Sequence, residues 1–166
     1  MFKLTGILLF IFFLNGDSIV DQVRVQCFEV DSLKRADYFI DQLKKEPSAE
    51  AKGYLATMLF LKSRIYKFPF KKMSFFNRGK TLLEESIDEN PSNLELRYLR
   101  YSIQNKAPDF LGYNNWVMQD LEFIKNNIDQ IQISNNIKVI ILKNILLYND
   151  VNLQDKVIFE KILDKL

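Results

Sequence analysis

Apolar positions recur every three or four residues along most of the chain, which is the spacing of helices with one buried face. Ser or Asn residues that can cap a helix precede several of these stretches, and Pro47 and Pro91 follow two of them. Short connections favour antiparallel packing of neighbouring helices. The pattern predicts helices at 33–46, 49–66, 74–90, 93–106, 114–127, 135–148 and 152–166.

Three other stretches carry less regular patterns. Residues 20–30 are rich in β-branched side chains and alternate only partly, so helix and strand both remain open. Residues 67–72 contain Pro69 and predict a linker. Residues 135–148 are apolar on nearly every side, which suggests a centrally packed helix, with a buried strand as the alternative. The expected buried face of the last helix consists of Val157, Ile158, Ile162 and Leu166.

A group of small and large residues in the third predicted helix resembles a tetratricopeptide repeat (TPR). Gly79, Leu83, Ser86 and Pro91 match the spacing of the second TPR helix, in which small residues let neighbouring helices approach closely. No second full repeat is visible. The resemblance implies an all-α fold, a TPR-like antiparallel array of about six or seven helices, in a single domain at 32–166.

A longer stretch, residues 51–124 and above all Arg97 to Tyr113, resembles an uncharacterised family of small exported helical proteins from Bacteroidota bacteria. This resemblance implies export and a helical fold. It implies no activity.

The first eighteen residues have the pattern of a signal peptide. Lys3 precedes an unbroken apolar run from Ile7 to Leu14, and small and polar residues follow. The run is about half of the roughly 20 residues that span a bilayer, so a permanent membrane helix is the weaker alternative. The sequence therefore predicts a signal peptide at 1–18, a lead-in segment at 19–31, and a periplasmic or secreted protein.

Composition restricts the chemistry. The chain has no His and one Cys, Cys27, so it cannot build an imidazole or thiolate metal site or a Ser-His or Cys-His nucleophile pair within one chain. We expect Cys27 to be a buried small hydrophobe, with a disulfide between chains as the alternative. A balance of 23 Lys and Arg against 21 Asp and Glu is too even for a dedicated nucleic-acid binder. No metal, cofactor, catalytic residue or nucleic-acid partner is predicted.

Residues 62–80 carry seven cations, five aromatic residues and no acid. Interleaved cations and aromatics can bind anionic lipid, acidic glycans or phosphate polymers, and export makes the envelope surface the best of these partners. The alternative is that the aromatics face the core and the cations lie on a solvated turn. The predicted basic surface consists of Lys62, Arg64, Lys67, Lys71, Lys72, Arg78 and Lys80.

A second candidate site surrounds the loop 107–115. Arg97 and Arg100 lie one turn apart on the helix before this loop, so their guanidinium groups could converge on a carboxylate or phosphate of a ligand, or on Asp109. The loop has aromatic residues around a glycine, a composition that also suits a structural corner docked into the core. The predicted binding residues are Arg97, Arg100, Tyr101, Asp109, Phe110 and Tyr113.

Two acidic pairs, Glu84 with Asp88 and Glu85 with Glu89, lie four residues apart on the polar side of an amphipathic helix. Paired carboxylates support acid–base chemistry only where their pKa values differ strongly. We expect these four side chains to be solvated and to have no catalytic role.

These patterns predict a non-enzymatic module that binds or scaffolds a peptide, protein or envelope component, because TPR-like helix pairs form concave grooves. A carboxylate-dependent hydrolase acting on an envelope polymer is one alternative, and it would need a deep pocket containing two acids. A membrane-surface protein that uses the basic segment is the other, and its binding to anionic vesicles would weaken with salt.

Overall fold

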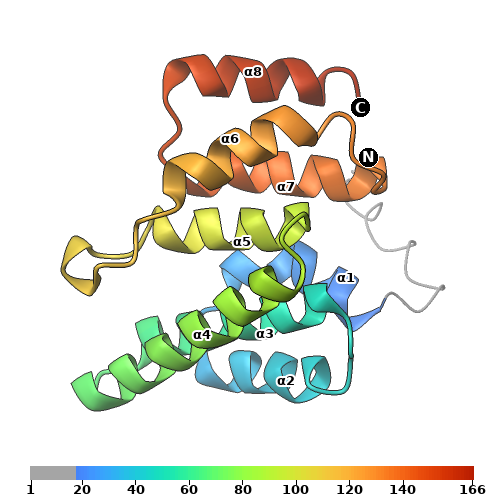
Figure 1. Ribbon diagram of the computed structural model, residues 1–166. Coiled ribbons are helices and arrows are strands. Elements are labelled where there is room, and N and C mark those ends of the chain that lie inside the picture. Colours follow the sequence, from blue (N-terminus) through green and yellow to red (C-terminus); the bar gives the residue numbers. More distant parts are fainter. Residues whose placement is uncertain (1–17) are drawn as a thin grey trace, which may run out of the picture.

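The computed structural model describes residues 18–166, and every regular element in this range is helical (Figure 1), which confirms the all-α fold class. Residues 1–17, which hold all but the last residue of the predicted signal peptide, lie outside the described residues. The helices are α1 (Ile19–Gln26), η1 (Cys27–Glu29), α2 (Leu33–Leu43), α3 (Ala49–Ile65), α4 (Pro69–Glu89), α5 (Leu94–Gln104), η2 (Asp109–Leu111), α6 (Val117–Asn127), α7 (Asn135–Tyr148) and α8 (Leu153–Leu163), where η marks a 3₁₀-helix.

Residues 18–166 thus hold eight α-helices instead of six or seven, because the lead-in segment contains α1. Ser18 caps this helix by accepting a hydrogen bond from the Asp21 backbone nitrogen at 3.2 Å. Glu95 of α5 accepts from Arg24 Nε at 2.7 Å and from the Tyr54 hydroxyl at 2.7 Å, so one carboxylate joins α1, α3 and α5. Cys27, directly after α1, is buried as expected.

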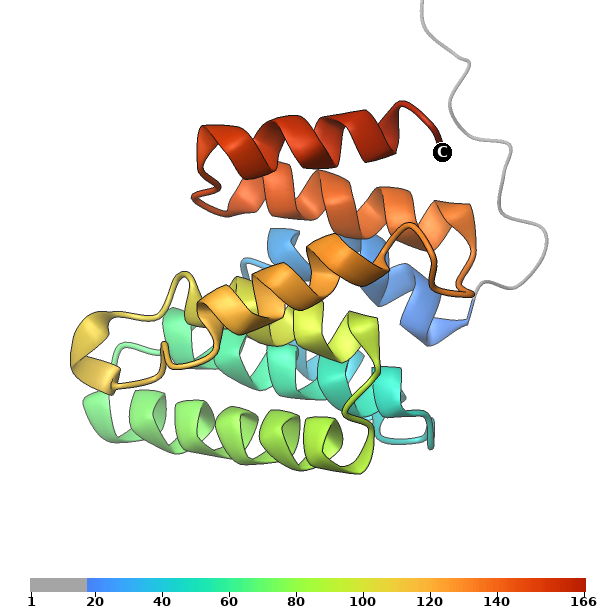
Figure 2. The same ribbon diagram turned by 45° about the horizontal axis from the view of Figure 1, so that its top comes forward.

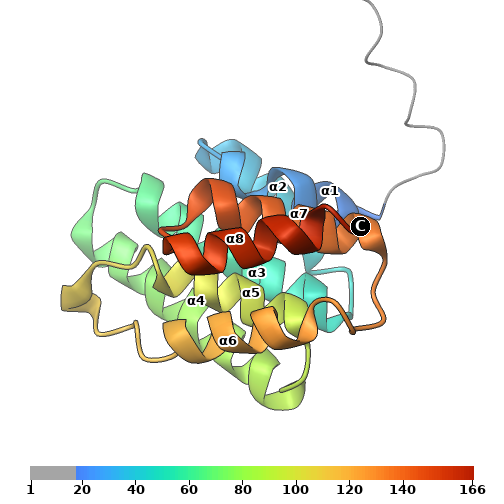
Figure 3. The same cartoon turned by 90° about the horizontal axis from the view of Figure 1, so that it is seen from above.

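Helices α3 to α8 form three successive antiparallel hairpins, α3 with α4, α5 with α6 and α7 with α8 (Figures 1 and 2). The hairpins stack in chain order, and in the view from above α8 lies over α7 (Figure 3). α2 packs on the outer side of α3, and α1 contacts α2, α3 and α7. Three connections in this array are short, 66–68, 90–93 and 149–152, and the link between α5 and α6 is long and contains η2.

The most extensive hairpin contact is that of α3 with α4, and it includes a glycine. A Cβ at Gly79 would lie 3.1 Å from the carbonyl oxygen of Ala56 and 3.1 Å from Cδ2 of Phe60. The absence of a side chain therefore allows α4 to approach the backbone of α3. Ser86, two turns later, is also buried and donates to the Leu82 carbonyl at 2.6 Å.

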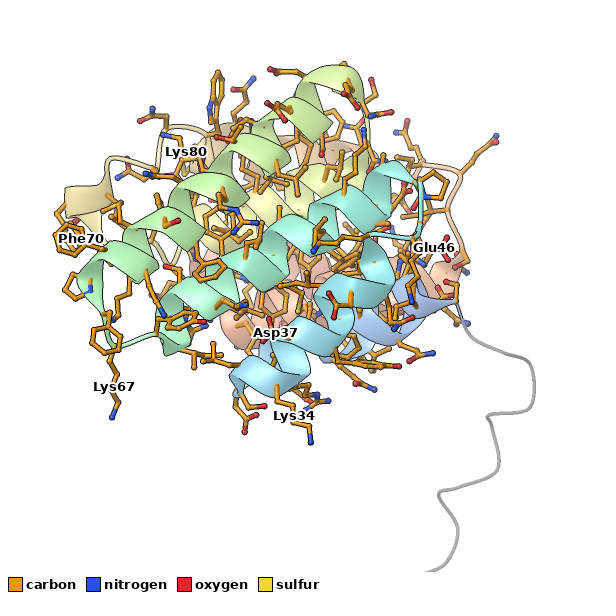
Figure 4. All side chains as sticks on the ribbon, turned by 90° about the horizontal axis from the view of Figure 1, so that it is seen from below. Lys34, Asp37, Glu46, Lys67, Phe70 and Lys80 are labelled. Atoms are coloured by element: carbon orange, nitrogen blue, oxygen red, sulfur yellow. The ribbon has the colours of Figure 1, made fainter. Side chains whose placement is uncertain are left out.

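The prediction of a linker at 67–72 is wrong for most of its length, because α4 begins at Pro69. Proline suits the first turn of a helix, where its missing N–H has no partner to lose and its fixed φ is already helical. Phe68 occupies the N-cap position without a capping side-chain hydrogen bond. The early start gives α4 a first turn, around Phe70, that extends beyond the core (Figure 4).

The expected helix at 135–148 is confirmed, because α7 is a helix that packs between α8 and α5. The expectation for the buried face of the last helix changes. In α8, Val157 is 40% exposed and is not part of the buried face. Phe159 is buried in its place, together with Asp155, which accepts from Lys125 Nζ of α6 at 2.9 Å. The hydrophobic pattern of the sequence does not reveal this buried face of α8, because one of its inward positions, Asp155, is charged.

Candidate functional site

The two arginines of the predicted site point to a carboxylate of the chain itself. Arg100 Nε and Nη2 donate to Oδ2 and Oδ1 of Asp120 at 2.7 and 2.9 Å, and Arg97 Nη1 donates to Oδ1 at 2.9 Å. Asp120 lies in α6 and is fully buried. The internal acceptor is therefore Asp120 and not Asp109. Three donors on two oxygens make this a structural joint between α5 and α6.

Glu84 extends the joint to α4. It accepts from Arg100 Nη1 at 2.7 Å and from the Tyr113 hydroxyl at 2.6 Å. Burial, together with the neighbouring Glu84 carboxylate, raises the pKa of Tyr113 well above its usual range. The expectation of a solvated Glu84 is thus wrong, because this side chain is half-buried between cations and a phenol, whereas Glu85, Asp88 and Glu89 are exposed.

The six predicted binding residues therefore separate into two groups. Arg97, Arg100, Tyr101 and Tyr113 lie within the packing of the helices, and burial, with smaller contributions from Asp155 and Asp150, raises the pKa of Tyr101 to about 12. Asp109 and Phe110 instead lie on η2 and are exposed, so the structure does not bring them to the arginines. The loop is a corner on its inner side and a free surface on its outer side.

The predicted basic surface also divides. Lys62 is buried, forms an ion pair with Asp37, and lies 4.5 Å from the ring centre of Phe75. Lys80 lies 5.0 Å from the ring centre of Tyr113. Arg78 contacts Phe75, and Lys71 is exposed near Tyr66 and Phe68. The remaining members are Arg64, Lys67 and Lys72.

Those three cations surround a cavity of about 420 Å³ between α3, the first turns of α4, the end of α5 and η2. The volume falls within the range of about 300–1,000 Å³ that is usual for ligand sites. Figure 4 shows Lys67 and Phe70 at the same end of the molecule. The walls are mainly apolar and include Phe28, Phe60, Leu61, Pro69, Met73, Phe76, Ile103, Ala107, Pro108, Phe110 and Leu111.

A fourth cation, Lys106, lies at the end of α5 and completes the rim of this cavity, and no acid is among the lining residues. Arg64, Lys67, Lys72 and Lys106 form no ion pair within 4.0 Å in the described part of the chain. Burial lowers the pKa of Lys106, and the nearby Arg64 guanidinium lowers it further, against the attraction of Asp150. The rim is therefore a site of unbalanced positive charge.

The nearest acids on the other side of Arg64 are Glu29 and Asp31. They line a separate hollow of about 330 Å³ with Arg64, and neither forms an ion pair with it. The Arg64 guanidinium group is therefore available to bind an anion in the larger cavity. Sequence reasoning found three of the four rim cations and missed Lys106, because a single lysine at a helix end carries no signal that relates it to residues about forty positions earlier.

Comparison with known proteins gives no matching family, no similar curated protein and no similar solved structure. The resemblance of Arg97 to Tyr113 to a family of exported helical proteins therefore stays a prediction. Within residues 18–166 no group of acidic or thiol side chains has the arrangement of a metal site. No helix in that range combines the length and the apolar character needed to cross a membrane.

Proposed function

We propose that this chain is a non-enzymatic binding module that holds an amphiphilic anion of the cell envelope in the cavity between α3, α4, α5 and η2. The apolar body of the ligand lies against the walls, and its carboxylate or phosphate lies at the rim. One observation carries this proposal: the cavity has apolar walls, four cations without ion pairs, and no carboxylate.

The two halves of such a ligand match the two parts of the site. Apolar surface that leaves water contributes about 25 cal/mol per Å², so the walls favour an alkyl or aryl body. An anion between Arg64 and Lys106, which line the same cavity, relieves the mutual repulsion of these two cations. Hydrogen bonds from ionised donors to an ionised acceptor are also the stronger kind.

The stacked helix hairpins support a TPR-like module. Gly79 and Ser86 lie on α4 in its hairpin with α3, the positions at which a TPR needs small residues. The signal-peptide pattern of residues 1–18 and the resemblance of Arg97 to Tyr113 support export. An exported module would meet amphiphiles of the envelope. A cavity without acids supports binding over the carboxylate-dependent hydrolase that we considered.

The test is calorimetric titration with matched twelve-carbon amphiphiles below their micelle concentrations. We expect laurate and dodecyl phosphate to bind with one molecule per chain, and dodecyltrimethylammonium not to bind. The preference between laurate and dodecyl phosphate identifies the head group. Equal binding of the cationic amphiphile would contradict the proposal, because hydrophobic contact alone would then explain the affinity.

Three variants locate the site. Arg64→Gln with Lys106→Gln should weaken laurate binding at least about tenfold, because one to two charge-assisted hydrogen bonds are lost. Ala107→Trp should fill the cavity and abolish binding. Lys34→Gln with Lys161→Gln is the matched control, because it removes the same charge from exposed positions on α2 and α8. Circular dichroism checks that each variant folds, and undiminished binding by a folded rim variant would overturn the assignment.

A further inference from the structure

We propose that the end of the molecule around the cavity docks on an anionic phospholipid bilayer through Phe68, Phe70 and Phe110, which we call the aromatic tip. These side chains are 68%, 92% and 84% exposed. Pro69 and Phe110 line the same cavity, so the first turn of α4 and η2 lie at the same end of the molecule although they are far apart in sequence. Figure 4 shows Phe70 at this end of the molecule.

The exposure of these rings has no explanation within the chain. Single apolar side chains on a surface are ordinary, but a cluster of large ones surrounded by charge marks an interaction site. Met73, one turn after Phe70, adds a further partly exposed apolar side chain at 44%. Burial of such a cluster against a partner is favourable because it removes apolar area from water.

Lysines border the aromatic tip. Lys67, Lys71 and Lys72 are exposed, and Lys71 Nζ lies 5.3 Å from the ring centre of Tyr66 and 5.9 Å from that of Phe68. The acid at the tip is Asp109, which precedes Phe110 and is exposed. Three lysines against one carboxylate leave the tip positive. Each lysine near an anionic leaflet contributes about 1 kcal/mol of attraction, or about fivefold in affinity.

A bilayer fits this arrangement better than a folded protein. The three rings are exposed on a helix end and on a loop, and Phe68 and Phe70 do not line the cavity, so a partner that deforms around them fits best. The boundary between headgroups and acyl chains accepts aromatic rings while lysines remain among anionic headgroups. The tip shares Phe110 with the cavity, but Phe68 and Phe70 do not line it, so the two proposals can be tested separately.

The test is flotation of the protein with vesicles of phosphatidylcholine alone or mixed with phosphatidylglycerol. We expect binding to the mixed vesicles at about 0.1 M salt and its loss at about 1 M, where screening shortens the electrostatic range to about 3 Å. Phe68→Ser with Phe70→Ser should lower the affinity for mixed vesicles at least about tenfold, and Lys71→Gln should lower it about fivefold. Absence of wild-type binding, or equal binding by the Phe variant, would overturn the inference.

Matched controls separate the tip from general hydrophobicity and charge. Val25→Ser with Met118→Ser removes apolar side chains that are 61% and 64% exposed elsewhere, and Lys34→Gln removes one exposed lysine from α2. Both controls should bind like the wild type, and an equal loss in the first control would also overturn the inference. Laurate titration of the Phe68, Phe70 variant should be unchanged, so a failure of docking and a failure of the cavity are distinguishable.

Discussion

Arg100 of α5 and Asp120 of α6 form a two-point ion pair in the interior, with both carboxylate oxygens accepting hydrogen bonds from the guanidinium group. Arg97 shares the same carboxylate, and Glu84 of α4 accepts the third hydrogen bond of Arg100. The pair therefore determines how three helices meet. It also converts the most obvious candidate for an anion site into a structural element.

Asp120→Asn should destabilise the fold strongly. The substitution leaves two guanidinium groups at a neutral amide, and the loss of one partner from a buried ion pair costs about 3–5 kcal/mol. Urea denaturation followed by circular dichroism measures the free energy of unfolding. Asp88→Asn, at an exposed position of α4, is the control and should change it by less than about 0.5 kcal/mol. Similar midpoints for the two variants would show that the pair is dispensable.

Gly79→Ala should lower the stability of the α3 and α4 hairpin. The new Cβ would lie 3.1 Å from the Ala56 carbonyl oxygen, which belongs to a helix backbone and cannot move alone. Overpacking of this kind costs about 1–3 kcal/mol and should exceed the gain from the better helix propensity of alanine. Asn77→Ala, at an exposed position of the same helix, should be neutral or stabilising. Thermal unfolding of both variants tests this prediction. A melting temperature of Gly79→Ala above that of the wild type would contradict the close approach of α3 and α4 at this position.

Cys27 should resist modification in the folded protein. Its side chain is buried, and this burial raises the pKa of the thiol, so both access and the reactive thiolate are lacking. Iodoacetamide treatment followed by mass spectrometry should show an unmodified chain in buffer and one modification in concentrated urea. Rapid modification without denaturant would show that α1 opens readily from α3 and α5.

Alkaline pH should destabilise the protein through its buried tyrosines. The pKa of Tyr101 is raised to about 12, and burial raises those of Tyr54 and Tyr98 well above the ordinary range. The folded state favours the neutral phenol. The contribution of Tyr101 to the stability of the fold is therefore complete below about pH 10, the pKa of an unfolded tyrosine, and is lost as the pH rises through about 12. The urea concentration at the midpoint of unfolding should therefore fall as the pH is raised from about 9 to about 12.

A pair of variants isolates one tyrosine in this transition. Tyr101→Phe should lose less stability than the wild type between about pH 10 and 12, because it has no phenol to ionise at that position. Tyr38→Phe is the control, since Tyr38 is 53% exposed. If the pH dependence of Tyr101→Phe equals that of the control, ionisation of Tyr101 does not contribute to alkaline unfolding.

Local sequence rules identified most of the helices. The predicted capping residues Ser32 and Ser48 precede α2 and α3, and each accepts the expected backbone hydrogen bond. Such caps depend on a few neighbouring residues, which is why they are readable from sequence. The linker prediction at 67–72 misses the early start of α4, because proline usually breaks a helix but is also favoured at the first helical position.

The candidate site depended on contacts between distant segments. The order of residues is enough to predict an all-helical chain and a basic segment rich in aromatics, and the absence of histidine limits the possible chemistry. The contacts of the folded chain are needed to see that Arg97 and Arg100 meet Asp120, and that Lys106 and Arg64 line one cavity. Helix periodicity indicates which face of a helix is buried, but not which helix covers it. The packing partner depends on contacts between distant segments and not on the sequence of the helix alone.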